Sequence, residues 1–348
     1  MSRSFAQYTK DCEQYVRSIR SLYYQGAKLE QVINMSLPFE LKPAHEAPYK
    51  KGMLMAHGFL SSPYLMRSLA QDFAKANFLV RAVLLPGHGT QYQDLDNYTW
   101  EDWLATIKLG YDSLAKDCEE IYLCGFSIGA TLSLLFALSA FKQQNCKIKK
   151  LILLGPCLGV KPIAKTFPFL VKKNLTRFLP KLFCTQAEAE HLGSYTQFSI
   201  KSVAQVTELL SLLKKELKPY QKQQIPLPLF ISASHEDGTV KFKPISQLVK
   251  THLQKQDYFY VYSNHPLKLP KNTPNTTINM HKGNILAMSH VAIPVAPTDP
   301  YFGKDGSYYG QLPENTKFGE PHLTHSIKRL TYNPDYNNLK EKILAWLI

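Results

Sequence analysis

The sequence has few features of a disulfide framework, a metal site or a membrane anchor. Its six cysteines include no C-x-x-C pair, which removes support for zinc-binding and thioredoxin-type redox sites. So few cysteines in a chain of 348 residues indicate either a reducing compartment such as the cytoplasm or simply a fold without a disulfide framework. Residues 1–20 contain no continuous apolar run, and the sequence therefore predicts no secretory signal.

Acidic residues are scarce relative to basic ones. Lys and Arg number 41 against 27 Asp and Glu, which gives a formal net charge of +14. This balance favours contact with anionic surfaces without identifying one. No nucleic-acid recognition motif accompanies the charge, so we predict no nucleic-acid partner. Hydrophobic residues make up 45% of the chain, which excludes global disorder.

The longest uncharged stretch, residues 121–141, meets the length requirement of a membrane span. Its first part resembles a β-strand, and Gly125 and Gly129 interrupt it before a helix-like run. Because other strand and helix patterns flank this stretch, we predict a buried strand, a tight turn and a buried helix instead.

Strand-like and helix-like patterns alternate along most of the chain, which predicts a parallel sheet with helices on both faces. An amphipathic helix is expected over residues 5–23 and a final helix over residues 339–347. Residues 291–333 are rich in Pro, Gly, Tyr and Asn and predict a long ordered loop or small insertion. The expected strands are Met53–Ala56, Phe78–Leu85, Ile121–Cys124, Leu151–Leu154, Leu229–Ser232 and Tyr258–Tyr262.

Residues 125–129, GFSIG, match the pattern G-x-S-x-G. They follow a strand-like run and open a helix-like run, which is the context of a nucleophile turn. Such a turn strains the backbone at Ser127 and exposes its hydroxyl above the sheet, and flanking glycines avoid a clash there. We therefore predict Ser127 as a catalytic nucleophile, with an ordinary glycine-rich turn as the alternative.

A serine nucleophile needs a general base, and the base needs a carboxylate that orients it. Beside a nucleophile turn, acid and base follow later strands in the order serine, acid, histidine. Asp237 follows the expected strand 229–232, with Glu236 as the rival acid, and His290 follows a later strand. We predict Asp237 as the acid and His290 as the base. The less favoured histidines are His265, His281, His322 and His325.

Acyl transfer also requires N–H donors for an oxyanion. The expected strand 53–56 leads into His57, Gly58 and Phe59, and the backbone N–H of Phe59 is the expected first donor. The N–H of Ile128, at a helix N-terminus, is the expected second donor.

Two further histidines lie near these expected donors. His57, beside Gly58, is predicted to support its loop through a hydrogen bond. His88 lies between two glycines in a second loop near the site. A metal site formed by His57 and His88 is the weaker alternative, because no carboxylate or cysteine is suitably spaced.

The runs HGF, LPGHG, TWEDWLATIKLGYDSL and GFSIG together resemble the α/β-hydrolase superfamily, in particular its carboxylesterase and monoacylglycerol-lipase branch. With Asp237 and His290, the resemblance extends from about residue 50 to 292 and to the last helix. It implies an α/β-hydrolase fold with a helical cap, and neither a metal nor an organic cofactor. The implied division is an N-terminal helical extension, 1–50, a core, 51–156 and 225–348, and a cap, 157–224.

The expected cap begins in a basic segment that has no acidic residue between Ile121 and Ala187. Over residues 171–182, apolar side chains fall on one helical face and basic side chains on the other. This pattern predicts either a basic amphipathic cap that contacts anionic lipid or a cap whose lysines are merely solvated. The basic residues of that face are Lys172, Lys173, Arg177 and Lys181.

These observations predict a serine hydrolase that cleaves carboxylic esters through a Ser127–Asp237–His290 triad and an acyl-enzyme. Its expected substrates are esters of short or medium acyl chains or a monoacylglycerol. The alternatives are a thioesterase or acyltransferase with the same triad, or a non-catalytic protein that binds a hydrophobic ligand. The expected location is cytoplasmic, with or without peripheral contact at a membrane surface.

Overall fold

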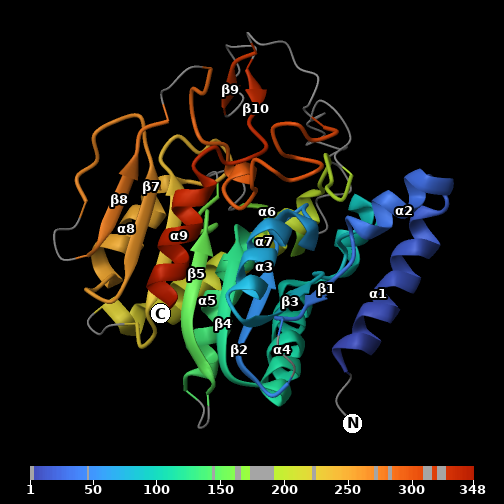
Figure 1. Ribbon diagram of the computed structural model, residues 1–348, viewed down its shortest axis with the longest axis horizontal. Coiled ribbons are helices and arrows are strands. Elements are labelled where there is room, and N and C mark those ends of the chain that lie inside the picture. The colour runs from blue at the N-terminus through green and yellow to red at the C-terminus, as the bar shows by residue number, and fades with distance from the viewer. Residues whose placement is uncertain are drawn as a thin grey trace.

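The computed structural model describes residues 4–44, 47–142, 146–160, 166–172, 192–221, 225–269, 273–280, 284–308, 316–319 and 327–348. Within these ranges, eight strands form one sheet in the order β1-β3-β2-β4-β5-β6-β7-β8 (Figure 1). β1 pairs antiparallel to β3, and every other pairing in this sheet is parallel. The strands are β1 Phe39–Leu41, β2 Tyr49–Ala56, β3 Phe78–Val83, β4 Cys118–Phe126, β5 Ile148–Leu154, β6 Leu229–Ser234, β7 Tyr258–Tyr262 and β8 Asn275–Ile278.

Helices cover both faces of the sheet because successive strand residues point to opposite sides. Leu54 and Ala56 of β2 belong to the core that contains residues of α4, α5, α7 and α8. Met53 and Met55 belong to the core on the other face, with residues of α3 and α9. The helices are α1 Phe5–Arg20, α2 Gly26–Asn34, α3 Arg67–Lys75, α4 Trp100–Asp117, α5 Ile128–Ala140, α6 Phe167–Lys172, α7 Ile200–Leu217, α8 Phe242–His252 and α9 Tyr336–Leu347.

The predicted parallel sheet with helices on both faces is confirmed, and so is the strand-turn-helix prediction for residues 121–141, which form most of β4 and α5. None of the helices in the described ranges is long and apolar enough to cross a membrane.

The predicted N-terminal helix is present as α1, which buries Phe5, Tyr8 and Val16. The prediction was wrong at its end, because α1 stops at Arg20. Leu22 and Tyr23 lie beyond it with 72% and 63% of their surface exposed. Hydrophobic spacing does not reveal the end of a helix, and these side chains follow the last turn instead of extending its buried face.

The segment expected to form the cap is described at α6 and α7. α7 packs against α4 and α5, and its Leu209 and Leu213 join the core on that face. In α6, Lys172 is exposed and its Nζ lies 3.8 Å from Glu208 Oε1. Lys173, Arg177 and Lys181 lie outside the described residues, so the predicted basic helix face stays a prediction.

Residues 291–308 cover the carboxyl end of the sheet with a series of turns (Figure 1). Ile293, Val295 and Phe302 are buried against the α3 and α9 side of the core. Asn333 bonds back to this segment, because its side chain donates to the Ile293 carbonyl at 3.1 Å. Two short strands, β9 Phe318–Gly319 and β10 Lys328–Arg329, pair in parallel.

Candidate active site

The turn between β4 and α5 holds Ser127 in a strained conformation, with φ 55° and ψ −116°. Its N–H donates to the Leu154 carbonyl at 2.9 Å. A Cβ atom at Gly125 would lie 2.4 Å from the Ala130 backbone, and one at Gly129 would lie 2.2 Å from the Ala56 carbonyl oxygen. Both positions therefore require glycine, and the surrounding contacts hold a backbone conformation that serine would otherwise avoid.

Asp237 and His290 come together although they are far apart in the sequence. Nδ1 of His290 lies 2.6 Å from Oδ2 of Asp237, and the two side chains are 4% and 1% exposed. The other carboxylate oxygen, Oδ1, accepts the N–H groups of Thr239 and Val240 at 2.7 and 2.9 Å. A carboxylate only accepts, so Nδ1 carries the hydrogen of this bond.

The His290 ring lies beside the turn that carries Ser127. Its centroid is 4.7 Å from that of Phe126, the residue before the serine. Gly155, directly after β5 and with φ 50°, also lies close to this ring. A Cβ atom there would be 3.0 Å from Cε1 of His290. The structure thus brings Ser127, Asp237 and His290 to the carboxyl edge of the same parallel sheet.

The loop after β2 packs against Ser127, since a Cβ atom at Gly58 would lie 3.0 Å from the serine Cβ. Among the described residues, no acceptor bonds to the backbone N–H of Phe59 or of Ile128. Ile128 opens α5, where the first N–H groups of a helix have no partner within the helix. Two N–H donors are therefore available on the two segments that flank the serine.

His57 is fully buried and links two loops. Its Nδ1 lies 2.8 Å from the Gly58 carbonyl oxygen, and its Nε2 accepts the N–H of Leu85 at 3.0 Å. A carbonyl only accepts and an N–H only donates, so the ring is neutral with its hydrogen on Nδ1. Burial, with nearby His88, depresses the pKa of His57 well below its usual value.

His88 lies among aromatic rings. Its Nδ1 is 3.2 Å from the carbonyl oxygens of Leu85 and Pro86, and burial lowers its pKa to about 4. The ring stacks on Tyr195 with 6.2 Å between centroids and meets Trp103 edge-on at 6.0 Å. The described residues contain no cluster of three or more His, Cys, Asp or Glu side chains that could hold a metal ion.

The rival residues lie elsewhere. Glu236 accepts the N–H of Asn264 at 2.9 Å and lies 3.2 Å from Nδ1 of His235. His265 stands 6.1 Å from His235, centroid to centroid. Both rivals therefore take part in a loop contact separate from the His290–Asp237 pair. His281, His322 and His325 lie outside the described residues.

Sequence reasoning missed Gly155 and Trp103. A glycine directly after a predicted strand, in the run LLGP, was the available signal for Gly155. Trp103 lies in α4, and its Nε1 donates to the Pro86 carbonyl at 3.0 Å, which secures the loop that carries His88. No local pattern predicts this long-range bond.

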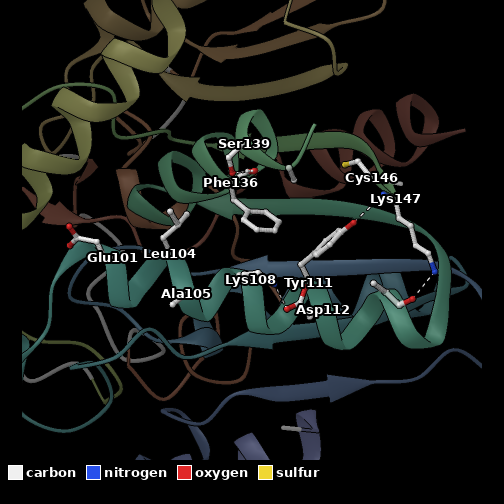
Figure 2. A pocket seen from close by; sticks show the side chains of 12 residues that line it. Glu101, Leu104, Ala105, Lys108, Tyr111, Asp112, Phe136, Ser139, Cys146 and Lys147 are labelled. Atoms are coloured by element: carbon white, nitrogen blue, oxygen red, sulfur yellow. Dashed lines mark hydrogen bonds and ion pairs between the residues drawn. The ribbon is translucent and has the colours of Figure 1, made fainter. Parts of the chain in front are cut away.

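A cavity of about 530 Å³ is separate from this site. It lies between α4 and α5, as Figure 2 shows, and none of the proposed site residues lines it. Tyr111 and Phe136, which both line it, pack against each other with 5.2 Å between ring centroids. An ion pair between Lys108 and Asp112 lies at its edge.

The sheet order, the strained serine turn and the carboxylate–imidazole pair together define an α/β hydrolase. Residues 47–265 match the family described as serine aminopeptidase, S33, and the chain belongs to this family. The fold is also that of a structure from work on the metagenome-derived lipolytic enzymes LipS and LipT (TM-score 0.56, 17% identity, 89% of this chain and 96% of that one). A monoacylglycerol lipase of Paleococcus ferrophilus is similar in fold (TM-score 0.53, 15% identity, 89% and 97% covered).

Two relatives are similar in sequence. A thermostable monoacylglycerol lipase of Bacillus sp. (strain H-257) is 43% identical over 86 residues, which cover 25% of this chain and 34% of that protein. A carboxylesterase of Bacillus subtilis (strain 168) is 25% identical over 173 residues, or 49% and 58% of the two chains. The chain thus spans about a third of the length of the monoacylglycerol lipase and somewhat over half of the length of the carboxylesterase. The predicted resemblance to this branch of the superfamily is confirmed.

Proposed function

We propose that this protein is a serine hydrolase that cleaves carboxylic esters. The observation that carries the proposal is the buried 2.6 Å contact between His290 Nδ1 and Asp237 Oδ2, beside the strained turn of Ser127. A hydroxyl, an imidazole and a carboxylate in this order are the components of nucleophilic acyl transfer.

The proposed reaction proceeds in two stages. Nε2 of His290 takes the proton of the Ser127 hydroxyl as the oxygen attacks the ester carbonyl, and Asp237 stabilises the resulting imidazolium. The N–H groups of Phe59 and Ile128 hold the oxyanion. His290 then protonates the leaving alcohol, which gives an acyl-enzyme. Water that is deprotonated by His290 releases the acid and restores the serine.

We propose esters of short or medium acyl chains, or a monoacylglycerol, as the substrate class. Apolar rings beside the proposed oxyanion loop support this choice, since Phe59 lies 6.1 Å from Trp103 and 6.5 Å from Phe198. The similarity to a Bacillus monoacylglycerol lipase favours the same class. A thioesterase or acyltransferase would use the same residues and differ in the leaving group or the acceptor.

A fluorophosphonate probe tests the nucleophile. We expect the wild-type protein to be labelled, and Ser127→Ala to lose both labelling and esterase activity while its circular dichroism is unchanged. Retained activity in this variant would refute the assignment of Ser127, and an unlabelled wild-type protein would favour a non-catalytic binding protein. A series of p-nitrophenyl esters, run beside acyl-CoA and monoacylglycerol, distinguishes the substrate classes.

We further propose that the protein is cytoplasmic and that its cap contacts anionic lipid. The five described cysteines, which are all free thiols, are consistent with a reducing compartment. In α6, the Lys172 side chain is 76% exposed and Phe169 is 59% exposed, a combination that suits a lipid surface. In liposome flotation we expect binding only to vesicles that contain anionic lipid. Equal and negligible binding to both kinds of vesicle would exclude the contact.

A further inference from the structure

Helix α1 lies outside the residues that match the family, 47–265, yet it bonds directly to the loop after β3. The hydroxyl of Tyr8 donates to the Leu84 carbonyl at 2.7 Å and accepts the Leu84 N–H at 2.9 Å. Tyr8 is only 6% exposed. Arg20 donates to the Gly89 carbonyl at 2.9 Å, farther along the same loop. The N-terminal helix therefore holds a loop of the candidate site.

The end of β1 explains why this hydroxyl is needed. The antiparallel pairing of β1 with β3 stops at Phe39 and Ala82, so β3 runs on past its edge strand. Leu84 lies two residues beyond this pair, and its N–H and C=O groups would be buried without a strand partner. The single hydroxyl of Tyr8 satisfies both groups.

The peptide unit between Leu84 and Leu85 connects Tyr8 to His57. Its carbonyl, from Leu84, accepts the Tyr8 hydroxyl, and its N–H, from Leu85, donates to Nε2 of His57 at 3.0 Å. On the other side of the imidazole, Nδ1 lies 2.8 Å from the Gly58 carbonyl. That carbonyl shares its peptide unit with the N–H of Phe59.

The donors of this series all face the same way. The Tyr8 hydroxyl donates to a peptide carbonyl, the N–H of that peptide donates to His57, and His57 donates to the next peptide carbonyl. Hydrogen bonds in such a chain polarise one another, and each one strengthens the next. The last donor of the chain is the Phe59 N–H, for which the described residues supply no acceptor.

We propose that Tyr8 and His57 are positioning residues that orient and polarise the Phe59 N–H for the oxyanion. This inference rests on the proposed function and extends it to the N-terminal helix. Neither side chain is assigned a contact with the substrate. Tyr8 acts through His57, and His57 acts through the Gly58–Phe59 peptide, so the effect is expected on transition-state binding and not on substrate binding.

The test compares Tyr8→Phe with Tyr15→Phe. Both variants lose one hydroxyl from α1, but the Tyr15 hydroxyl bonds to Oδ2 of Asp94 at 3.2 Å, outside the chain of bonds to His57. Loss of a direct oxyanion donor lowers kcat by about 10²–10³-fold, and we expect about 3- to 10-fold for Tyr8, which acts through intermediate bonds. The KM for p-nitrophenyl butyrate is expected to stay unchanged.

A trifluoromethyl ketone provides a second measurement, because the serine adduct carries an oxyanion. Its inhibition constant is expected to rise in Tyr8→Phe by the same factor as kcat falls, and to stay at the wild-type value in Tyr15→Phe. If Tyr8→Phe does not fold, a ring-fluorinated tyrosine at position 8 keeps the hydroxyl and makes it a stronger donor. We then expect a higher kcat.

The outcomes separate the two proposals. An active wild-type protein whose Tyr8→Phe and Tyr15→Phe variants have equal kcat and equal inhibition constants overturns the role of Tyr8. An unchanged kcat in the fluorinated protein does the same. A wild-type protein without esterase activity or fluorophosphonate labelling overturns the proposed function itself.

Discussion

Gly155 offers a direct way to disturb the candidate general base without changing any polar group. It follows β5 with φ 50°, and a Cβ atom there would lie 3.0 Å from Cε1 and 3.1 Å from Nδ1 of His290. The ring cannot simply retreat, because Asp237 holds Nδ1 at 2.6 Å and Phe126 packs beside it. In Gly155→Ala the imidazole must therefore shift relative to the serine turn.

Two costs are expected in Gly155→Ala, and they can be separated. Alanine in this left-handed conformation should lower the free energy of unfolding by about 1–2 kcal/mol. Misplacement of a catalytic group by about 1 Å can cost about 100-fold in rate, and because the shift here is smaller we expect kcat to fall about 10- to 100-fold. KM should change little, since no proposed substrate contact is altered.

Gly26 provides the matched control. Its φ is 53°, and a Cβ atom there would meet nothing within 4 Å. Gly26→Ala should therefore lower the free energy of unfolding by a similar amount and leave kcat unchanged. Urea unfolding and p-nitrophenyl butyrate hydrolysis measure the two effects. If Gly155→Ala kept the wild-type kcat while losing as much stability as Gly26→Ala, His290 would not be the base that the proposal requires.

Two further predictions concern charge. Asp237→Asn should lower kcat by about 10⁴-fold in the same ester assay, because the amide favours the wrong tautomer of His290, and a loss below about tenfold would contradict the triad. Burial depresses the pKa of His57 well below its usual value and that of His88 to about 4, so below about pH 6.5 the unfolded chain takes up protons that the folded chain does not. The contribution of these two histidines to the free energy of unfolding is therefore fully present above that pH and is lost progressively on acidification. By about pH 5, wild type should lose about 2 kcal/mol relative to His88→Gln in urea unfolding, and parallel curves would refute this.

The central strands were predictable because strands buried on both faces form continuous apolar runs. The two edge strands escaped prediction for the converse reason. β1 has only three residues, Phe39–Leu41, and β8, Asn275–Ile278, contains three polar residues. An edge strand has fewer neighbours to pack against, so its sequence carries a weaker signal.

Ser127 and Asp237 could be proposed from the sequence because each follows a recognisable strand, and parallel strands bring such positions to one edge. His290 could be proposed because it comes after the acid in the chain order serine, acid, histidine. The bond from Tyr8 to Leu84 spans 76 residues and depends on where β1 stops pairing. No spacing rule encodes this. A tyrosine at helical spacing predicts only a buried ring. The partners of its hydroxyl can be identified only from the three-dimensional structure.

The groups of the candidate site are held mainly by backbone atoms. Asp237 is fixed by two N–H groups of its own loop, His57 by one N–H and one carbonyl, and the Ser127 turn by a bond to the Leu154 carbonyl. These backbone partners lie at the ends of the strands or in the loops that directly follow them, so the polar groups are preorganised before a substrate arrives. Changes in the proposed cap, 157–224, should therefore alter which of the proposed ester substrates is accepted far more readily than they alter how the carbonyl is attacked.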